Sequence, residues 1–370
     1  MSLSLPHSPL PAGKKRIYLD HAATSPLRPE ARAAMEEGWR IWANPSSPHS
    51  EGRAARAALE DARARIKAAL KWDGELIFTS GASEAISLAM SRAKVDRKLI
   101  SAVEHEAVFR AAPDAEVLPV AGCDSAFKGE VTEEILAEAL KRPGRALVAI
   151  QTINSETGSH QLGNARNPLA EMVREANGLF LSDCSQSACE YRLPDADMVV
   201  VSAHKLGGPI GIGALLVRDF AMLEPMGGHE YGYRMGTENM PAALGFAAAL
   251  EAGGTESWAH DVDDVRAFRK ALWDHGELVH PGNNCWHIIA VAMPTLSAAA
   301  QLMRFDSMGI SVSAGSACSS GTLKRSRAMK AFGIDEDTAS RTIRVSLGWN
   351  TTRDDLDRFV EAYSQLARGA

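Results

Sequence analysis

The sequence has few cysteines, and their number and spacing exclude two common kinds of stabilised domain. Five cysteines occur in 370 residues, an odd number, and no two of them form a CxxC pair. A disulfide framework and a zinc ribbon are therefore both excluded as the basis of the fold, and we expect no metal ion. Free thiols are typical of a reducing compartment, so we expect a cytoplasmic protein.

Long apolar runs and an excess of positive charge are also missing. The sequence has no uninterrupted apolar stretch of the length that spans a membrane, and its first residues lack the basic and apolar regions of a secretory signal. Lysine and arginine number 40 against 46 aspartates and glutamates, which gives a net charge of −6. We therefore expect neither a membrane protein nor direct binding to nucleic acid.

The composition is that of a globular protein with more than one domain. Hydrophobic residues make up 45% of the chain and charged residues 23%, and 370 residues exceed the size of one ordinary domain. Residues 1–15 are proline-rich and show little apolar periodicity. We expect an N-terminal arm at residues 1–15, a large domain at 16–255 and a small C-terminal domain at 256–370.

Apolar strand-like stretches alternate with alanine-rich amphipathic stretches in the first two thirds of the chain. Strands are predicted at residues 75–79, 98–102, 115–120, 146–151, 179–182, 197–202 and 213–217. Helices are predicted at 54–70, 132–140, 169–176 and 241–251. Further on, helices are predicted at 258–275, 296–307 and 353–367, with strands at 287–293 and 342–346. The pattern predicts an α/β domain with a mostly parallel sheet, followed by a smaller α+β domain.

A lysine at the end of an apolar strand is the strongest chemical signal. Three valines precede Ser202-Ala-His204-Lys205, and a glycine-rich turn follows. Desolvation of an ammonium group at such a position lowers its pKa, which makes Lys205 a candidate for a Schiff base with an aldehyde. Most lysines in loops are simply solvated, so this interpretation needs a second signal.

Two further stretches supply groups that pyridoxal 5′-phosphate (PLP) needs. Asp183 follows another predicted strand, and a carboxylate there can keep the pyridine nitrogen of PLP protonated. Residues 80–84 read Ser-Gly-Ala-Ser-Glu, a glycine turn at a helix start, where backbone N–H groups and hydroxyls can bind phosphate. Together with Lys205, these residues indicate a PLP site.

The chain resembles the cysteine desulfurases, which belong to the class V branch of the fold type I PLP enzymes. The matching motifs follow in family order along most of the chain, at residues 18–24, 44–49, 78–84, 104–105, 154–158, 183–186, 202–205, 227–239, 313–321 and 343–348. The resemblance implies a fold type I PLP-dependent transferase and a homodimer. It also implies conversion of L-cysteine to L-alanine, with the sulfur kept as a persulfide on an enzyme cysteine.

The resemblance further implies roles for individual residues. The residues implied to hold the cofactor are Ala82, Ser83, Asn154, Asp183, Gln186, Ser202, His204, Lys205 and Thr237. Among these, Thr237 is implied to reach the phosphate of the neighbouring subunit, and Gln186 the phenolic oxygen of the ring. Those implied to be catalytic are Cys318, Lys205 and His105, with His105 on the face of the ring. Arg344 is implied to bind the substrate carboxylate, together with Asn154.

Cys318 lies in a run of small residues, Ser313-Ala-Gly-Ser-Ala-Cys-Ser-Ser-Gly321, that suits no conventional core. An exposed thiol in such a loop can ionise and attack a substrate held elsewhere. Cys184, Cys189 and Cys285 occur in strand-like or core-like stretches, where cysteine is usually inert. Cys318 is therefore the candidate that accepts the sulfur.

Some points stay open at this stage. Asn154-Ser155 stands where close relatives carry two asparagines, so the contact made by the second asparagine has no certain counterpart. The alternative functions are another class V reaction, such as that of a selenocysteine lyase or an aminotransferase, and a scaffold without catalysis. The thiol loop argues against transamination, and a scaffold is disfavoured by the joint presence of Lys205, Asp183, His105 and Cys318. We expect the persulfide to pass to an acceptor protein, such as a scaffold for iron–sulfur cluster assembly.

Overall fold

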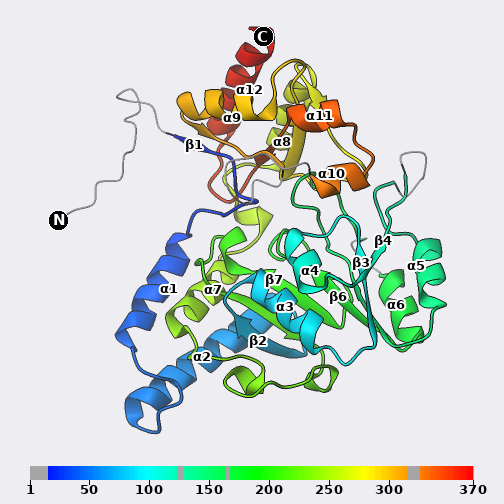
Figure 1. Ribbon diagram of the computed structural model, residues 1–370. Helices are drawn as coiled ribbons and strands as arrows, with labels where there is room; N and C mark the ends of the chain where they lie inside the picture. The colour runs from blue at the N-terminus through cyan, green and yellow to red at the C-terminus, as the bar shows by residue number, and fades with distance from the viewer. Residues whose placement is uncertain (1–15, 123–127, 163–166, 316–325, 370) are drawn as a thin grey trace.

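The computed structural model describes residues 16–122, 128–162, 167–315 and 326–369. Figure 1 shows two parts, a larger one built around a seven-stranded sheet and a smaller one that contains the C-terminal helices. None of the helices within the described ranges combines the length and hydrophobicity needed to cross a membrane.

The large sheet has the strand order β2–β8–β7–β6–β5–β3–β4. Its strands are β2 (Glu75–Thr79), β3 (Arg97–Ser101), β4 (Glu116–Leu118), β5 (Ala146–Ala149), β6 (Leu179–Asp183), β7 (Met198–Ser202) and β8 (Gly213–Val217). Neighbouring strands pair in parallel except that β8 is antiparallel to both β7 and β2. The predicted α/β fold with a mostly parallel sheet is confirmed.

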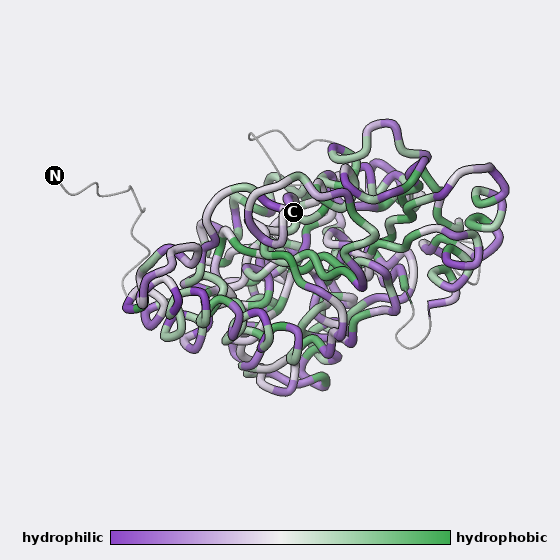
Figure 2. The backbone as a smooth tube through the Cα atoms, turned by 90° about the horizontal axis from the view of Figure 1, so that it is seen from below, coloured by the Kyte–Doolittle hydropathy of each residue, from purple (hydrophilic) through white to green (hydrophobic). Residues whose placement is uncertain are grey.

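Helices cover both faces of this sheet. One face packs against α2 (Ser50–Ala69), α5 (Glu133–Leu140), α6 (Pro168–Glu175) and α7 (Met240–Glu251), and the other against α3 (Ala82–Arg92) and α4 (Glu106–Ala111). Because side chains alternate along a strand, Val199 and Val201 belong to the first core and Met198 and Val200 to the second. Figure 2 shows that segments of hydrophobic residues run through the middle of the molecule.

Helix α7 is buried on all sides, because α1 (Pro29–Arg40) and α2 both pack against it. The contact between α1 and α7 requires glycine on both helices. A Cβ on Gly38 would lie 2.6 Å from Cα of Pro241, and a Cβ on Gly245 would lie 2.7 Å from Cγ of Met35. Sequence analysis predicts α7 but not α1, whose buried positions, Ala31 and Gly38, give no strong apolar pattern.

The smaller part contains an antiparallel sheet in the order β12–β10–β9, with β9 (Glu277–Leu278), β10 (Ile288–Ala292) and β12 (Thr342–Ser346). Its helices are α8 (Val262–Trp273), α9 (Ala298–Ser307), α10 (Arg327–Ala331), α11 (Glu336–Arg341) and α12 (Arg353–Arg368). Phe305, Phe359 and Tyr363 stack in its core. This core includes Ile343 and Val345 of β12, the strand that carries Arg344.

The N-terminal strand β1 (Ile17–Tyr18) pairs in parallel with β11 (Ile310–Ser311). Ile17 and Leu19 are buried in the hydrophobic core of the C-terminal part. The range predicted for the large domain includes these residues, but their pairing partner holds them in the smaller part. The division near residue 255 stays a prediction.

A buried ion pair closes the outer edge of strand β2. The Glu230 carboxylate accepts hydrogen bonds from Nη1 and Nη2 of Arg63, at 2.8 and 2.9 Å, and from the backbone N–H of Phe78, at 2.7 Å. Arg63 also donates to the carbonyl oxygen of Leu76, at 2.7 Å. Side chains therefore satisfy backbone groups that an edge strand would otherwise expose.

We expect Glu230→Gln to lower the free energy of unfolding by about 2 to 3 kcal/mol, measured by urea denaturation. The buried guanidinium of Arg63 would then keep only the partly exposed Glu60 as a counter-charge. The control is Glu37→Gln, which removes an exposed pair with Arg40 and should cost less than about 1 kcal/mol. An equal decrease in the free energy of unfolding of the two variants would show that the buried pair stabilises the fold no more than an exposed pair does.

Candidate active site

The candidate residues follow strands whose C-terminal ends meet at one edge of the large sheet. Strands β2, β3, β5, β6 and β7 all run in the same direction, because β2 and β7 are both antiparallel to β8. The residues at or just after these ends are Ala82 and Ser83, His105, Asn154, Asp183 and Gln186, and Ser202, His204 and Lys205. In open α/β sheets this edge is where ligands bind.

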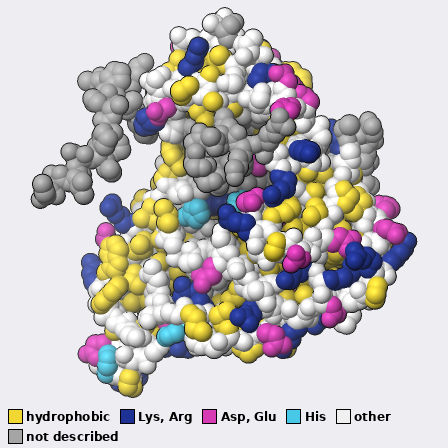
Figure 3. Space-filling model, in the orientation of Figure 1, with side chains coloured by type: hydrophobic (Ala, Val, Ile, Leu, Met, Phe, Trp, Pro, Cys, Tyr) yellow, Lys and Arg dark blue, Asp and Glu magenta, His cyan; other side chains and the backbone are white. Residues whose placement is uncertain are grey.

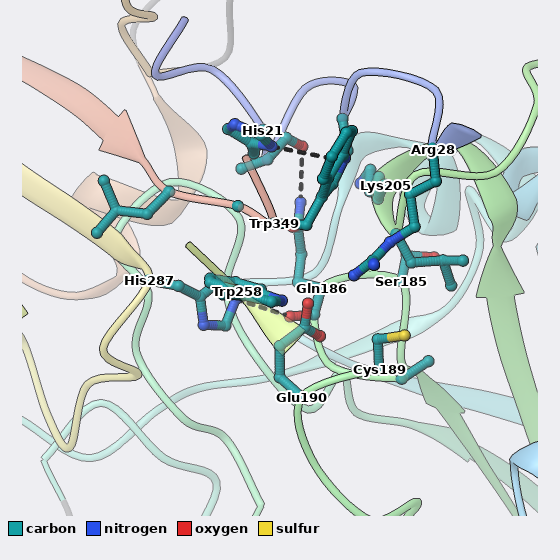
Figure 4. A pocket seen from close by; sticks show the side chains of 16 residues that line it. His21, Arg28, Ser185, Gln186, Cys189, Glu190, Lys205, Trp258, His287 and Trp349 are labelled. Atoms are coloured by element: carbon teal, nitrogen blue, oxygen red, sulfur yellow. Dashed lines mark hydrogen bonds between the residues drawn. The ribbon is translucent and has the colours of Figure 1, made fainter. Parts of the chain in front are cut away.

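Lys205 ends a single turn of 3₁₀ helix, η1 (Ala203–Lys205), that begins directly after β7. The Ala203 carbonyl holds this turn by accepting hydrogen bonds from the backbone N–H groups of Leu206, at 3.2 Å, and Gly208, at 2.9 Å. Lys205 is partly buried and lines a pocket together with Gln186 (Figure 4). The turn therefore fixes the lysine at the edge of the sheet.

A polar cradle, which we define as Ser202, Gly81 and the first turn of α3, lies beside this turn. The side chain of Ser202 is 1% exposed, and its Oγ has no hydrogen-bond partner among the described residues. Ser202 pairs with Gly213 across the sheet, and a Cβ on Gly213 would lie 2.9 Å from Cα of Gly81. Gly81 has φ 148° and open space where a Cβ would stand, just before the first turn of α3. An unpartnered hydroxyl, an open glycine and a helix N-terminus fit a phosphate group.

His204 is fixed by a residue that the sequence did not single out. Its Nδ1 lies 2.9 Å from Oγ1 of Thr24, and its carbonyl accepts a hydrogen bond from the N–H of Ser25, at 2.8 Å. Burial, and then the charge of Lys205, lowers the pKa of His204 to about 4. The ring is therefore neutral at pH 7. The only sequence signal for Thr24 is its place at the end of the motif at residues 18–24.

Asp183 and Gln186 are held by their own turn and by the N-terminal segment. Oδ1 of Asp183 accepts the N–H of Ser185 at 2.9 Å. Nε2 of Gln186 donates to the carbonyl of Ala22 at 2.9 Å (Figure 4), which leaves a second N–H on the same nitrogen. Gln186 can thus still donate to an oxygen at this edge.

Behind Asp183 lies a second carboxyl group that sequence analysis gave no role. Glu104 is buried, and one of its oxygens accepts the N–H of Gln151 at 2.6 Å. Burial, and then the charge of Asp183, raises its pKa well above the usual range. Burial therefore favours the protonated form of Glu104, which limits the negative charge beside Asp183.

His105 caps helix α4. Its Nδ1 accepts the backbone N–H of Ala107 at 3.2 Å. Burial, and then the charge of Lys205, lowers the pKa of His105, so the ring is neutral at pH 7. With Nδ1 used as an acceptor, the proton of the neutral ring resides on Nε2. The cap therefore determines which nitrogen can exchange a proton.

Arg344 reaches the site from strand β12. It donates from Nη1 to the carbonyl of Ser155 and from Nη2 to Oδ1 of Asp20, both at 2.8 Å. Its Nε is buried and has no partner within the described chain. The guanidinium therefore already holds one carboxylate, and the N–H of Nε and one N–H on each Nη remain as donors for another.

Asn154 is used inside its own turn. Its Oδ1 accepts from the N–H groups of Glu156 and Thr157, both at 3.0 Å, and its Nδ2 donates to the carbonyl of Val103, at 3.0 Å. These contacts join the turn after β5 to the loop that leads to His105. A contact from Asn154 to cofactor or substrate stays a prediction.

Two predicted site residues remain to be considered, Cys318 and Thr237. Cys318 is outside the described residues. The described residues on either side of it both lie beside Glu156: a Cβ on Gly315 would be 3.6 Å from its Oε2, and the side chain of Ser326 hydrogen-bonds to the same carboxyl. Thr237 is exposed at the surface of the chain. The cradle of this subunit is therefore formed without Thr237.

The pocket next to Lys205 is walled by uncharged histidines at the boundary between the two parts. Figure 4 shows His21 and His287 on its walls, together with Trp258 and Trp349. Burial lowers the pKa of His21 to about 3 and that of His287 to about 4, and neighbouring histidines add to both shifts. Both side chains are therefore neutral until the pH is well below 6.

Acid should destabilise the protein through these histidines. Below pH 6.5 the unfolded chain binds protons that the folded chain does not, so each histidine costs about 2 kcal/mol of folding free energy at pH 5 and nothing at pH 7. We expect His287→Gln to lose about 2 kcal/mol less than the parent protein between pH 7 and pH 5, measured by urea unfolding. Parallel curves for His287→Gln and the parent would contradict a neutral His287.

Comparisons with known proteins agree with this geometry. The family described as Aminotransferase class-V matches residues 17–359. Cysteine desulfurase IscS 1 of Archaeoglobus fulgidus is 31% identical, over 93% of this chain and 95% of its own. A NifS-like protein from Rickettsia africae has a TM-score of 0.82 at 27% identity, covering 96% and 100% of the two chains. A structure described as SspA in complex with cysteine has a TM-score of 0.74 at 26% identity, covering 91% and 100%. The chain therefore belongs to the class V aminotransferase family and, within it, to the cysteine desulfurases.

Proposed function

We propose that the protein converts L-cysteine to L-alanine with PLP as cofactor and carries the sulfur away as a persulfide. The observation that supports this most is the buried Ser202 hydroxyl, which finds no partner in the described part of the chain and lies next to the open Gly81, one turn before Lys205. A phosphate would satisfy that hydroxyl, and an aldehyde on the same molecule would meet the lysine. A single PLP molecule would therefore account for both the buried hydroxyl of Ser202 and the lysine beside it.

Different residues at this edge of the sheet would bind different groups of PLP. Ser202, His204 and the first turn of α3, with Ala82 and Ser83, would hold the phosphate. Asp183 would face the ring nitrogen and Gln186 the phenolic oxygen. Bound PLP supplies an acceptor for the electron pair left at the substrate Cα.

Two side chains would move protons in the proposed reaction. Lys205, once its amine is free, would take the proton from Cα of the substrate. His105 carries its proton on Nε2 and can pass it to the substrate. Arg344 would bind the substrate carboxylate through the N–H groups that its contacts with Ser155 and Asp20 leave unused.

Sulfur transfer is assigned to Cys318. Its thiolate forms a bond to the sulfur of the substrate, while the bond between that sulfur and Cβ breaks and its electron pair stays with the carbon. The carbon then takes a proton and becomes the methyl group of alanine. The support from the structure is indirect: Gly315 and Ser326 both lie beside Glu156, in the turn whose Ser155 carbonyl contacts Arg344.

A homodimer is the proposed assembly. Large apolar side chains remain exposed at the C-terminal end of α1, with Trp39 at 54% and Trp42 at 75%, and in the glycine-rich segment, which we define as residues 227–239, with Met235 at 61%. Figure 3 shows hydrophobic side chains gathered over α1. Exposed apolar groups in such number mark an interface, and Thr237 lies in the same region.

The proposed sulfur acceptor is a protein partner such as a scaffold for iron–sulfur cluster assembly, in the cytoplasm. A persulfide must pass to another thiol before the enzyme can act again, which requires a partner that can reach Cys318. The three described cysteines, Cys184, Cys189 and Cys285, are free thiols, as is usual in a reducing compartment.

The proposal is tested with purified protein, PLP and L-cysteine. We expect alanine in equal amount to the sulfide released by dithiothreitol, and no keto acid. L-Selenocysteine is the comparison substrate. A kcat/KM that is higher for selenocysteine and close to zero for cysteine would identify a selenocysteine lyase instead. Keto acid formation from an amino donor would identify an aminotransferase.

A further inference from the structure

The glycine-rich segment is held in a strained conformation by two ion pairs. Two of its residues other than glycine lie in the left-handed region, Glu230 with φ 47° and Tyr231 with φ 58°. Such a conformation costs about 1 to 3 kcal/mol per residue and persists only where the surrounding contacts enforce it. One ion pair joins this segment to Arg63 of α2, beside strand β2, and the other joins it to Glu84 of α3, at the phosphate cradle.

The first tie is the Glu230–Arg63 pair at the edge of β2. Because the Glu230 carboxylate also accepts the N–H of Phe78, the segment is attached directly to the strand that leads into Gly81. Both side chains are nearly inaccessible, at 1% for Glu230 and 6% for Arg63. This contact therefore leaves the segment little freedom to shift along β2.

The second tie reaches the cradle itself. Nε of Arg234 donates to both oxygens of Glu84, at 3.1 and 3.3 Å, and Glu84 stands in the first turn of α3. Glu84 also accepts the backbone N–H of Ser80, immediately before Gly81. Burial would raise the pKa of Glu84, but the Ser80 N–H and the charge of Arg234 outweigh it and hold the pKa below its usual value. The pair is therefore charged at neutral pH.

We propose that Glu84 and Arg234 are positioning residues that couple the two cofactor sites of a dimer. Glu84 belongs to the turn that would hold the phosphate of its own subunit, and Arg234 is three residues from Thr237. The inference rests on the proposed function, because Thr237 is taken to reach the phosphate of the neighbouring subunit. A shift of α3 on binding phosphate is then passed through the ion pair to the residue that serves the other site.

A merely local role for the pair makes a different prediction. If Arg234 only steadied α3, its loss would weaken the site of its own subunit and leave the neighbouring site unchanged. If Arg234 positions Thr237, its loss weakens the neighbouring site. The two roles are therefore separated by asking which subunit of a dimer loses affinity for PLP.

Heterodimers with two different purification tags answer this question. One subunit carries Lys205→Ala together with Arg234→Ala, and the other subunit is unchanged and reports PLP bound to its Lys205. We expect the dissociation constant of PLP at the reporting site, from absorbance titration of the apoprotein, to rise about tenfold over that of a dimer with Lys205→Ala alone. Thr237→Ala in the Lys205→Ala subunit, in place of Arg234→Ala, should raise this dissociation constant at least as much. Arg234→Lys in that subunit should raise it less.

The matched control is Arg142→Ala in the Lys205→Ala subunit, which removes an exposed pair with Glu116 far from the segment. It should leave the dissociation constant unchanged, and sedimentation should show a dimer in every case. An unchanged constant with Arg234→Ala, when Thr237→Ala raises it, would overturn the inference and leave the proposed function intact. If Thr237→Ala also has no effect, the contact between subunits is absent and the inference falls with it. Failure of the unaltered protein to bind PLP would instead refute the proposed function.

Discussion

Replacing Lys205 by alanine is expected to abolish the covalent attachment of PLP and to slow alanine formation by about 10³-fold. Lys205 follows β7 at the same sheet edge as Asp183 and the unpartnered hydroxyl of Ser202. Its loss removes both the amine that condenses with the aldehyde and the base for the Cα proton. The measurements are the visible absorption of the purified protein and the rate of alanine release.

The control for this variant is Lys141→Ala, which removes an exposed lysine paired with Glu138. It should keep the absorption and the rate of the parent protein. Borohydride reduction followed by peptide mass spectrometry identifies the modified lysine. A lysine adduct that persists in Lys205→Ala would show that another residue binds the aldehyde, and the site would have to be placed elsewhere.

Replacing Cys318 by alanine is expected to abolish persulfide formation while PLP stays attached to Lys205. The described cysteines cannot take over the role. Burial raises the pKa values of Cys184, Cys189 and Cys285 to about 12 in each case, so that all three are protonated thiols at neutral pH. Only the thiolate form is a competent nucleophile.

Mass spectrometry after brief exposure to L-cysteine measures this directly. We expect one extra sulfur on the peptide that contains Cys318. Cys189→Ala is the matched control and should form the persulfide at the rate of the parent protein. Alanine production by Cys318→Ala at the parent rate would show that Cys318 is not the acceptor, and the reading as a selenocysteine lyase would then be favoured.

The parts of the fold that the sequence predicts are those whose pattern is local. Strands such as β7 are continuous apolar runs, because both faces of a parallel sheet are covered, and polar or glycine residues mark their ends. Helix α1 escaped prediction because it packs through Ala31 and Gly38 instead of large side chains. The two-residue strands β1 and β11 depend on a partner almost the whole chain away, which no local window can show.

The site divides in the same way. The place of Lys205 and Asp183 at strand ends can be read from the sequence, because parallel topology brings such ends together. The contacts of Thr24 with His204 and of Asp20 with Arg344 join segments that are distant in sequence, so neither was predicted. The proton on Nε2 of His105 depends on a cap whose geometry only the folded backbone provides.

The pairing of β1 with β11 has a consequence for the order in which the chain is completed during synthesis. Ile17 emerges from the ribosome early, but Ile310, its partner, and the core around Phe359 emerge near the end. The large sheet can assemble as a unit before then. Ile17 and Leu19 must remain exposed until translation is almost finished, while α1 close behind them is already packed on α7. A chain released before residue 310 would therefore carry a folded sheet and a loose, apolar first strand, which is a ready target for chaperones and proteases.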